Sequence, residues 1–321
     1  MSKKQIINFF KIALPLLLGV FLIWYSYNKF TPGQLSEIKA YFREANYSYV
    51  FISLIFGLLS NLSRAWRWNY LLEPLGYKTQ YANNVMAVYI TYLMNLFIPR
   101  SGEVSRAVVI NKYENIPFEK AFGTIISERV ADLVVLVSLV TTALVMQFSI
   151  ISQYLIENVT LSKFYTILAI LFPLAIIAIL FLKFSKSLFI QKVKLFLKGL
   201  KEGIFSIAKM KNKWAFIAHT LFIWLMYVTM FYIMIFALEE TANISLTAVL
   251  CAFVVGGLTI TFTNGGFGSY PFFIAGILLL FGVPETAGTA FGWLVWTSQT
   301  AAIVILGGLS FLLLPVFNKP K

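Results

Sequence analysis

The sequence predicts an all-α membrane protein: a polytopic helical bundle of about six full spans and two re-entrant helical hairpins, arranged as an inverted-topology repeat. Hydrophobic residues make up 59% of the 321 residues and charged residues only 12%, and the mean hydropathy is +0.81. A soluble domain of this length cannot bury so much apolar surface. The apolar runs, such as Leu133–Met146, are long and unbroken, whereas a membrane β-barrel needs alternating segments of roughly ten residues.

Apolar stretches of spanning length recur along one integral membrane domain, residues 1–321. The first begins after two lysines, as a secretory signal does, but no small-residue cleavage site follows it, so we expect a retained helix. The full spans are expected at about 9–27, 47–63, 118–147, 163–182, 214–237 and 286–313.

Between the fourth and fifth spans, residues 184–212 are expected to form a cytoplasmic amphipathic helix. Nine lysines stand against one acid, Glu202, between positions 183 and 213. Apolar residues recur there at three- and four-residue steps, which is typical of a helix lying on an anionic membrane surface. A calmodulin-type target peptide has the same pattern and stays open as an alternative.

Two pairs of short apolar segments predict re-entrant hairpins. The first pair, 84–98 and 104–113, is joined by Pro99–Gly102, and the second, 246–262 and 267–281, by the glycine-rich stretch TNGGFGSYP. Fifteen residues of helix reach only about 22 Å, short of the ~30 Å hydrocarbon core. We therefore expect each pair to turn back inside the membrane.

Positive charge predicts the orientation. With both termini in the cytoplasm and both hairpins re-entrant, the inner segments carry 19 Lys and Arg residues and the outer loops carry 4, as expected of a multi-pass cytoplasmic (inner) membrane protein. The net charge of +13 follows this bias and indicates no nucleic-acid partner. Span, hairpin and span then occur twice, at about 47–147 and 214–313, with the hairpins entering from opposite sides. Inverted repeats of this kind build transporter substrate sites near the midplane.

Six charges fall within the expected membrane region, on the first hairpin and on the span that follows it. They are Arg100, Glu103, Arg106, Glu128, Arg129 and Asp132. Glu128 and Asp132 share a helix face and Arg129 can reach Asp132, while the hairpin tip should lie at a similar depth, so the two groups are expected to meet. Intramembrane charges tend to mark substrate paths, which favours a lipid head-group site. Because the six charges sum to zero, a purely structural network stays open.

Three further features are candidates. The second hairpin carries Asn264, Gly265, Gly266, Gly268 and Tyr270, and its glycines either open backbone N–H groups to a phosphate or simply break the helix. Arg64 and Arg67 could contact lipid phosphates at the inner surface, although positive-inside anchoring is the simpler explanation.

His219, within a span, is more typical of a hydrogen-bonded packing residue than of a proton relay. With one cysteine and one histidine in the chain, no metal site is expected, and no cofactor.

These segments together resemble a known family. Arg64 to Trp68 with LLEPLG, then IPRSGEVSRA, ERVADL and GGFG, is similar over nearly the whole chain to the lysylphosphatidylglycerol synthase transmembrane family of flippase-like membrane proteins. The resemblance implies a lipid-handling domain with paired re-entrant hairpins, similar to one that moves aminoacylated phosphatidylglycerol between leaflets. The aminoacyl-transferase domain of the fused synthases has no counterpart in these residues, so lysyl transfer is not implied. Many members have a proline before the glycines and a charge after them, where this chain has Asn264, Ser269 and Tyr270.

The sequence therefore predicts a lipid translocase without enzymatic activity. Its substrate would be a membrane phospholipid or a polyprenyl-phosphate lipid, with Arg100 and Arg106 receiving the phosphate and Glu128, Arg129 and Asp132 tuning and releasing it. Two alternatives stay open: a non-catalytic scaffold for envelope-lipid or lipid-linked glycan enzymes and, less favoured, a membrane transferase, which would need a metal-binding acidic cluster. A homo-oligomer or an envelope-biosynthesis enzyme partner is compatible with these hypotheses.

Overall fold

The computed structural model describes residues 3–98, 100–147, 210–263 and 265–318, and the single positions 169, 173 and 207. In this part of the chain every regular element is a helix. The chain divides into two units, Met1–Glu128 with Asn212–Lys321 (the main unit) and Arg129–Lys211, and each is described by itself. The span expected at 163–182 and the amphipathic helix expected at 184–212 lie outside the described residues, apart from isolated positions.

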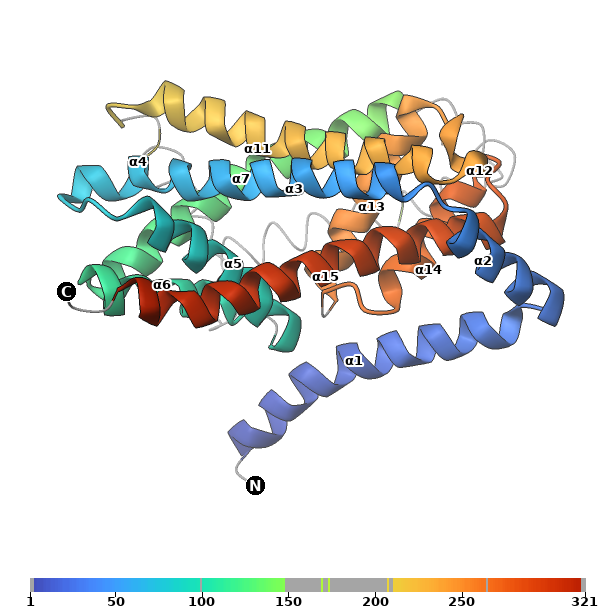
Figure 1. Ribbon diagram of the computed structural model, residues 1–321, viewed down its shortest axis with the longest axis horizontal. Helices are drawn as coiled ribbons and strands as arrows, with labels where there is room; N and C mark the ends of the chain where they lie inside the picture. The colour runs from blue at the N-terminus through green and yellow to red at the C-terminus, as the bar shows by residue number, and fades with distance from the viewer. Residues whose placement is uncertain are drawn as a thin grey trace. The chain divides into compact units, whose positions relative to one another are not determined.

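The described helices follow one another along the chain with short connections (Figure 1). Before the first long gap they are α1 (Lys3–Lys29), α2 (Pro32–Glu44), α3 (Tyr47–Arg67), α4 (Asn69–Leu72), η1 (Glu73–Leu75), α5 (Tyr81–Phe97), α6 (Gly102–Glu114) and α7 (Phe118–Met146). After it they are α11 (Lys213–Met234), η2 (Ile235–Ala237), α12 (Glu239–Ala242), α13 (Leu246–Phe262), α14 (Ser269–Leu279) and α15 (Glu285–Phe317).

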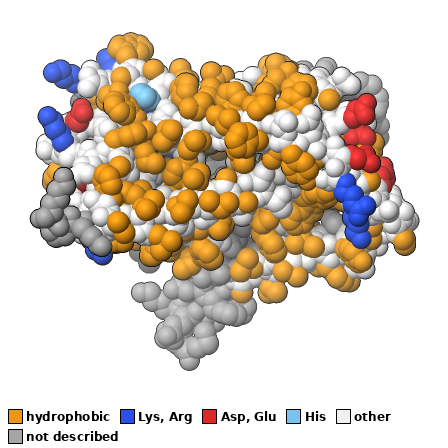
Figure 2. Space-filling view, in the orientation of Figure 1, with side chains coloured by type: hydrophobic (Ala, Val, Ile, Leu, Met, Phe, Trp, Pro, Cys, Tyr) orange, Lys and Arg blue, Asp and Glu red, His pale blue; other side chains and the backbone are white. Residues whose placement is uncertain are grey.

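Four stretches of the described residues are long and apolar enough to cross a membrane: Tyr47–Leu75, Phe118–Met146, Lys213–Ala237 and Glu285–Phe317. They confirm an all-α membrane bundle and coincide with four of the predicted spans. The first predicted span lies within α1, which is helical over Lys3–Lys29. Figure 2 shows that apolar side chains cover the middle of the visible face and that charged side chains gather at its two ends. This distribution suits helices that run through lipid.

Two pairs of short helices occupy the positions where re-entrant hairpins were predicted. Hairpin 1 consists of α5 and α6 and hairpin 2 of α13 and α14, and the two helices of each pair pack on each other. Even the longer arms, α5 and α13 with 17 residues each, reach only about 26 Å. In Figure 1, hairpin 1 lies toward the end of the main unit where the C-terminus is, and hairpin 2 toward the opposite end, beside α12. The hairpins thus enter from opposite ends, as an inverted repeat requires.

The tips of the two hairpins meet. A Cβ added to Gly265 of hairpin 2 would lie 3.2 Å from the Leu96 side chain of hairpin 1. Hairpin 1 turns tightly, because the Gly102 amide donates a hydrogen bond to Asn95 Oδ1 at 2.8 Å. A Cβ at Gly102 would clash with the Thr91 carbonyl oxygen, so only glycine lets α6 begin this close to α5.

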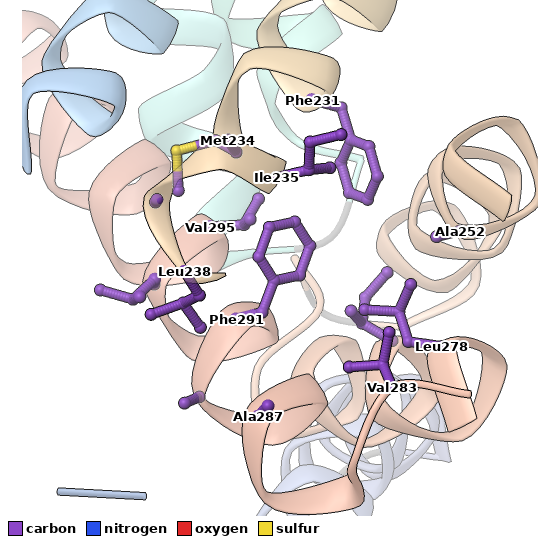
Figure 3. Packing of buried hydrophobic residues seen from close by; sticks show 14 of the residues in the cluster. Phe231, Met234, Ile235, Leu238, Ala252, Leu278, Val283, Ala287, Phe291 and Val295 are labelled. Carbon is purple, nitrogen blue, oxygen red and sulfur yellow. The ribbon is translucent and has the colours of Figure 1, made fainter. Parts of the chain in front are cut away.

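The base of each hairpin is held by the helices around it. For hairpin 2 the support is a buried apolar cluster (Figure 3), in which Phe231 of α11 and Phe291 of α15 pack edge to face with centroids 5.6 Å apart. Leu278 of α14 belongs to the same cluster. For hairpin 1 an apolar cluster with Met86 and Leu314 is accompanied by a polar contact: the Asn83 and Asn318 amides exchange hydrogen bonds of 2.9 and 2.8 Å. Close packing and interhelical hydrogen bonds are what hold helices together in lipid.

Candidate functional site

At the centre of the candidate site a buried carboxylate lies between two guanidinium groups. Glu128 of α7 accepts a hydrogen bond of 2.6 Å from Arg106 of α6 and one of 3.3 Å from Arg67 of α3. Each arginine uses a different carboxylate oxygen, and none of the three side chains is more than 1% exposed. All three belong to the main unit. Arg67, Arg106 and Glu128 form what we call the charge cluster.

Aromatic and hydroxyl side chains surround the charge cluster. The Arg106 guanidinium lies 3.7 Å from the centroid of the Trp68 ring, and the Trp68 indole N–H donates to the Thr124 hydroxyl at 2.8 Å. Arg67 donates to the Thr220 hydroxyl at 2.9 Å. A guanidinium over an aromatic face is stabilised most when both are shielded from water. The aromatic ring and the hydroxyl groups therefore stabilise the two buried arginine cations in place of water.

Helical spacing brings the α3 arginines to this place. Arg64 and Arg67 are three residues apart and share a face, and α3 packs along α11. Arg64 is 3% exposed, with its guanidinium 6.0 Å from the centroid of the Tyr227 ring of α11. The sequence left two roles open for these arginines, contact with lipid phosphates at the inner surface or, as the simpler explanation, positive-inside anchoring. The structure buries them among helices instead, because α3 remains helical to Arg67 with this face turned inward.

Within each unit the structure brings some of the six predicted charges together. The prediction that hairpin 1 meets the following span is confirmed by the contact of Arg106 with Glu128. Glu103, in the first turn of α6, is half-buried, and Arg100 is exposed at the tip with a φ of +63°. Arg129 and Asp132 are 3.7 Å apart, as their spacing predicted, and lie in the other unit.

Sequence reasoning missed the α3 contribution. Arg67 was not placed in the network, nor were Trp68, Thr124 and Thr220 singled out as its neighbours. One available signal was the pair of serines, Ser60 and Ser63. Together with Arg64 and Arg67 they make a continuous polar face on an otherwise apolar span. In the structure this face is buried.

A line of hydrogen-bonded polar side chains accompanies the charge cluster across α3, α11 and α5. His219 Nδ1 lies 2.8 Å from the Ser63 hydroxyl, which agrees with a hydrogen-bonded packing histidine. The Tyr227 hydroxyl donates to Asn61 at 3.3 Å and lies 3.0 Å from the Tyr92 hydroxyl of hairpin 1. Polar groups thus connect the three helices beside the cluster, as interhelical hydrogen bonds commonly do within membrane bundles.

Hairpin 2 offers a different environment. Gly265, Gly266 and Gly268 all have positive φ, and Asn264 lies outside the described residues. Two amides that we expected to face a phosphate donate within the loop: Gly265 to the Thr263 carbonyl and Gly266 to the Thr263 hydroxyl. Tyr270 is 5% exposed, beneath Gly256. In this structure the tip is a closed turn.

The arrangement is chemically suited to holding an anion. Guanidinium groups bind both carboxylates and phosphates, and the anion held here is the Glu128 carboxylate. Among the residues that the structure describes, no group of three His, Cys, Asp or Glu side chains gathers closely enough to hold a metal ion.

Comparisons with known proteins agree with these features. The family model of the lysylphosphatidylglycerol synthase TM region matches residues 12–308. A UPF0104 membrane protein of Methanocaldococcus jannaschii is 31% identical over 105 residues, 30% of each chain. The glycosyltransferase AglD of Haloferax volcanii is 30% identical over 111 residues, which cover 34% of this chain and 18% of that protein. No solved structure matches the chain significantly.

The two alignments thus cover less than a third of each relative's length, whereas the family match extends from within α1 to within α15. It includes both hairpins and the charge cluster. The chain is an integral membrane protein and belongs to the lysylphosphatidylglycerol synthase transmembrane family.

Proposed function

We propose that this protein moves a lipid with an anionic phosphate head group between the leaflets of the cytoplasmic membrane, without enzymatic chemistry of its own. The observation that carries the proposal is the charge cluster: two fully buried guanidinium groups clamped on one carboxylate beside a re-entrant hairpin. Charges at membrane depth are costly and tend to line substrate paths.

In this proposal Glu128 holds the place of the phosphate when no lipid is bound. A phosphate oxygen pair can replace the carboxylate on Arg67 and Arg106, because both anions accept two parallel N–H bonds from a guanidinium. Each arginine then keeps an anionic partner throughout the exchange. This avoids the cost of breaking a buried ion pair by removing the anion alone.

The arrangement of the hairpins is the second observation in favour of the proposal. Broken helices from the two halves of an inverted repeat commonly build the substrate site of a transporter near the bilayer midplane. Here the tips meet at Leu96 and Gly265, and hairpin 1 carries Arg106. In the proposed orientation the end of the main unit with α4 and the C-terminus faces the cytoplasm, in line with the Lys and Arg bias of the sequence.

A second candidate function is that of a non-catalytic partner of enzymes that act on lipid-linked glycans. The observation that favours it is the similarity of 111 residues to a glycosyltransferase. In that case the charge cluster would be purely structural. A homo-oligomer or an enzyme complex would be the functional form.

A leaflet assay distinguishes the two. Purified protein is placed in liposomes that contain fluorescent phosphatidylglycerol or a fluorescent polyprenyl phosphate, and dithionite reports how much probe reaches the outer leaflet. Arg67→Gln and Arg106→Gln are compared with Arg43→Gln, which removes an exposed arginine of α2. We expect movement in the wild type and in Arg43→Gln and its loss in both cluster variants.

The proposal is wrong if the wild type moves neither probe faster than protein-free liposomes do. It also fails if folded cluster variants move the probes at the wild-type rate. Monodispersity in detergent shows whether each variant is folded.

A further inference from the structure

At the end of the main unit opposite the charge cluster, α1 and α14 leave an apolar groove between them. Its volume is about 410 Å³, and its lining includes Tyr25 of α1, Phe272 of α14 and Val255 of α13. Lys29 and Glu285 also line it. These two are the last residue of α1 and the first residue of α15, so the polar part of the groove lies at the helix ends.

Close contact at one point and open space at another create the groove. At Gly268, whose φ is +66°, an added Cβ would clash with the Gly19 carbonyl oxygen of α1, so the two segments touch there. Two turns further along α14, a Cβ added to Gly276 would meet no atom within 4 Å. Phe272, Gly276 and Leu280 are four residues apart and lie on one face, so this face is uncovered where Gly276 stands.

The polar end of the groove carries both signs of charge. Lys29 and Glu285 form an ion pair, with 46% and 30% of their side chains exposed, so both remain accessible to a ligand. An anionic head group would be attracted by the Lys29 ammonium group but repelled by the Glu285 carboxylate. A head group with both a phosphate and an amine complements the pair fully, since each charge finds an opposite one.

We propose that this groove binds one phospholipid with a zwitterionic, amine-bearing head group. One acyl chain would lie along Phe272, Gly276 and Leu280, the phosphate would contact Lys29, and the amine would contact Glu285. The volume falls in the range of roughly 300–1,000 Å³ typical of small-molecule sites. The site involves none of the charge-cluster residues, so it stands or falls independently of the proposed translocation.

The test uses the full-length protein in phosphatidylglycerol vesicles that contain a trace of a photoactivatable lipid. Two probes share one acyl chain and differ in head group: phosphatidylethanolamine and phosphatidylglycerol. Mass spectrometry measures labelling of α1 and α14 peptides. We expect the ethanolamine probe to label these peptides about fivefold more than the glycerol probe, the factor that one exposed ion pair can supply.

Two sets of variants test the chain site and the head-group site. Gly276→Phe in α14 fills the open space and should remove the labelling. Gly308→Phe in α15 is the control and should not, because an added Cβ there also meets no atom within 4 Å and Gly308 does not line the groove. The double change Lys29→Gln and Glu285→Gln should remove the preference between the probes. Equal labelling by both probes in the wild type, or labelling unchanged by Gly276→Phe, would overturn the proposal. Translocation by Gly276→Phe, measured in parallel, keeps this outcome separate from the function proposed above.

Discussion

Replacing Glu128 by leucine should destabilise the main unit strongly. Arg106 and Arg67 contact the two carboxylate oxygens at 2.6 and 3.3 Å with no more than 1% of any side chain exposed. Removing one partner of such a buried pair typically costs about 3–5 kcal/mol, because it leaves an uncompensated charge behind. The change removes the acid that both arginines share, so we expect the loss to lie in this range.

Replacing all three charges together should largely undo that loss. In the variant Arg67→Met, Arg106→Met, Glu128→Leu no cluster charge is left to desolvate, and buried ion pairs exchanged for apolar side chains of similar volume are often neutral or stabilising. We expect the triple variant to regain at least about 2 kcal/mol relative to Glu128→Leu. Its lipid translocation should nevertheless be absent, because neither cluster guanidinium remains to receive a phosphate.

The assay is unfolding by sodium dodecyl sulfate in mixed micelles, followed by tryptophan fluorescence, since Trp68 is fully buried against Arg106. Glu44→Leu, at an exposed glutamate of α2, is the control. A cost below about 1 kcal/mol for Glu128→Leu would place the pair among solvent-screened ion pairs and refute the reasoning. Translocation at the wild-type rate by the triple variant would refute the head-group role and leave the cluster as structural support.

Three further outcomes are expected. Gly102→Ala should lower the thermal stability of the protein in detergent far more than Gly123→Ala does, because a Cβ at the first position clashes with a carbonyl of α5 and one at the second meets no atom within 4 Å; equal effects would contradict the tight turn. Trp68→Leu should cost about 1–2 kcal/mol through the lost contact with a desolvated guanidinium, whereas Trp66→Leu, at a 46% exposed site, should cost little in the same unfolding assay. Burial raises the pKa of Tyr41 in α2, outside the candidate membrane spans, to about 12. The native state therefore holds this proton more tightly than the unfolded chain, and stability should fall as the pH rises from about 10 toward 12. Tyr41→Phe should flatten that slope in a series of melting temperatures, and an unchanged slope would exclude this tyrosine as its source.

Much of the fold could be predicted because membrane constraints act on short stretches of sequence. A span needs an apolar run of fixed length, so the limits of α7 and α15 are close to those expected. A helix that is too short to cross the membrane has to turn back when Gly102 or the TNGGFGSYP stretch follows it. These two signals predicted the positions of both hairpins. These signals depend on neighbouring residues only.

The candidate site could be predicted only in part, since pairing across helices depends on how faces are rotated. That the charged segment of hairpin 1 meets the charged segment of α7 followed from depth alone, because both were expected near the same level, but the specific pair of Arg106 and Glu128 came from the structure. Arg67 lies at a helix end rich in aromatic residues, where anchoring at the interface is the commoner role. The packing of α3 against α11 and its other neighbours turns it inward, and no short stretch of sequence encodes these contacts.

The structural and functional interpretations of the charge cluster are compatible on energetic grounds. Arg67 and Arg106 keep the buried Glu128 carboxylate compensated. In the proposed function a competing ligand has to replace these two charge-assisted hydrogen bonds in a water-poor site, and this sets how strongly it must bind. A neutral head group cannot meet that requirement, whereas a phosphate offers the same charge and more acceptor atoms. The charge cluster that holds hairpin 1 against α3 and α7 would therefore also determine which lipid head groups can displace Glu128.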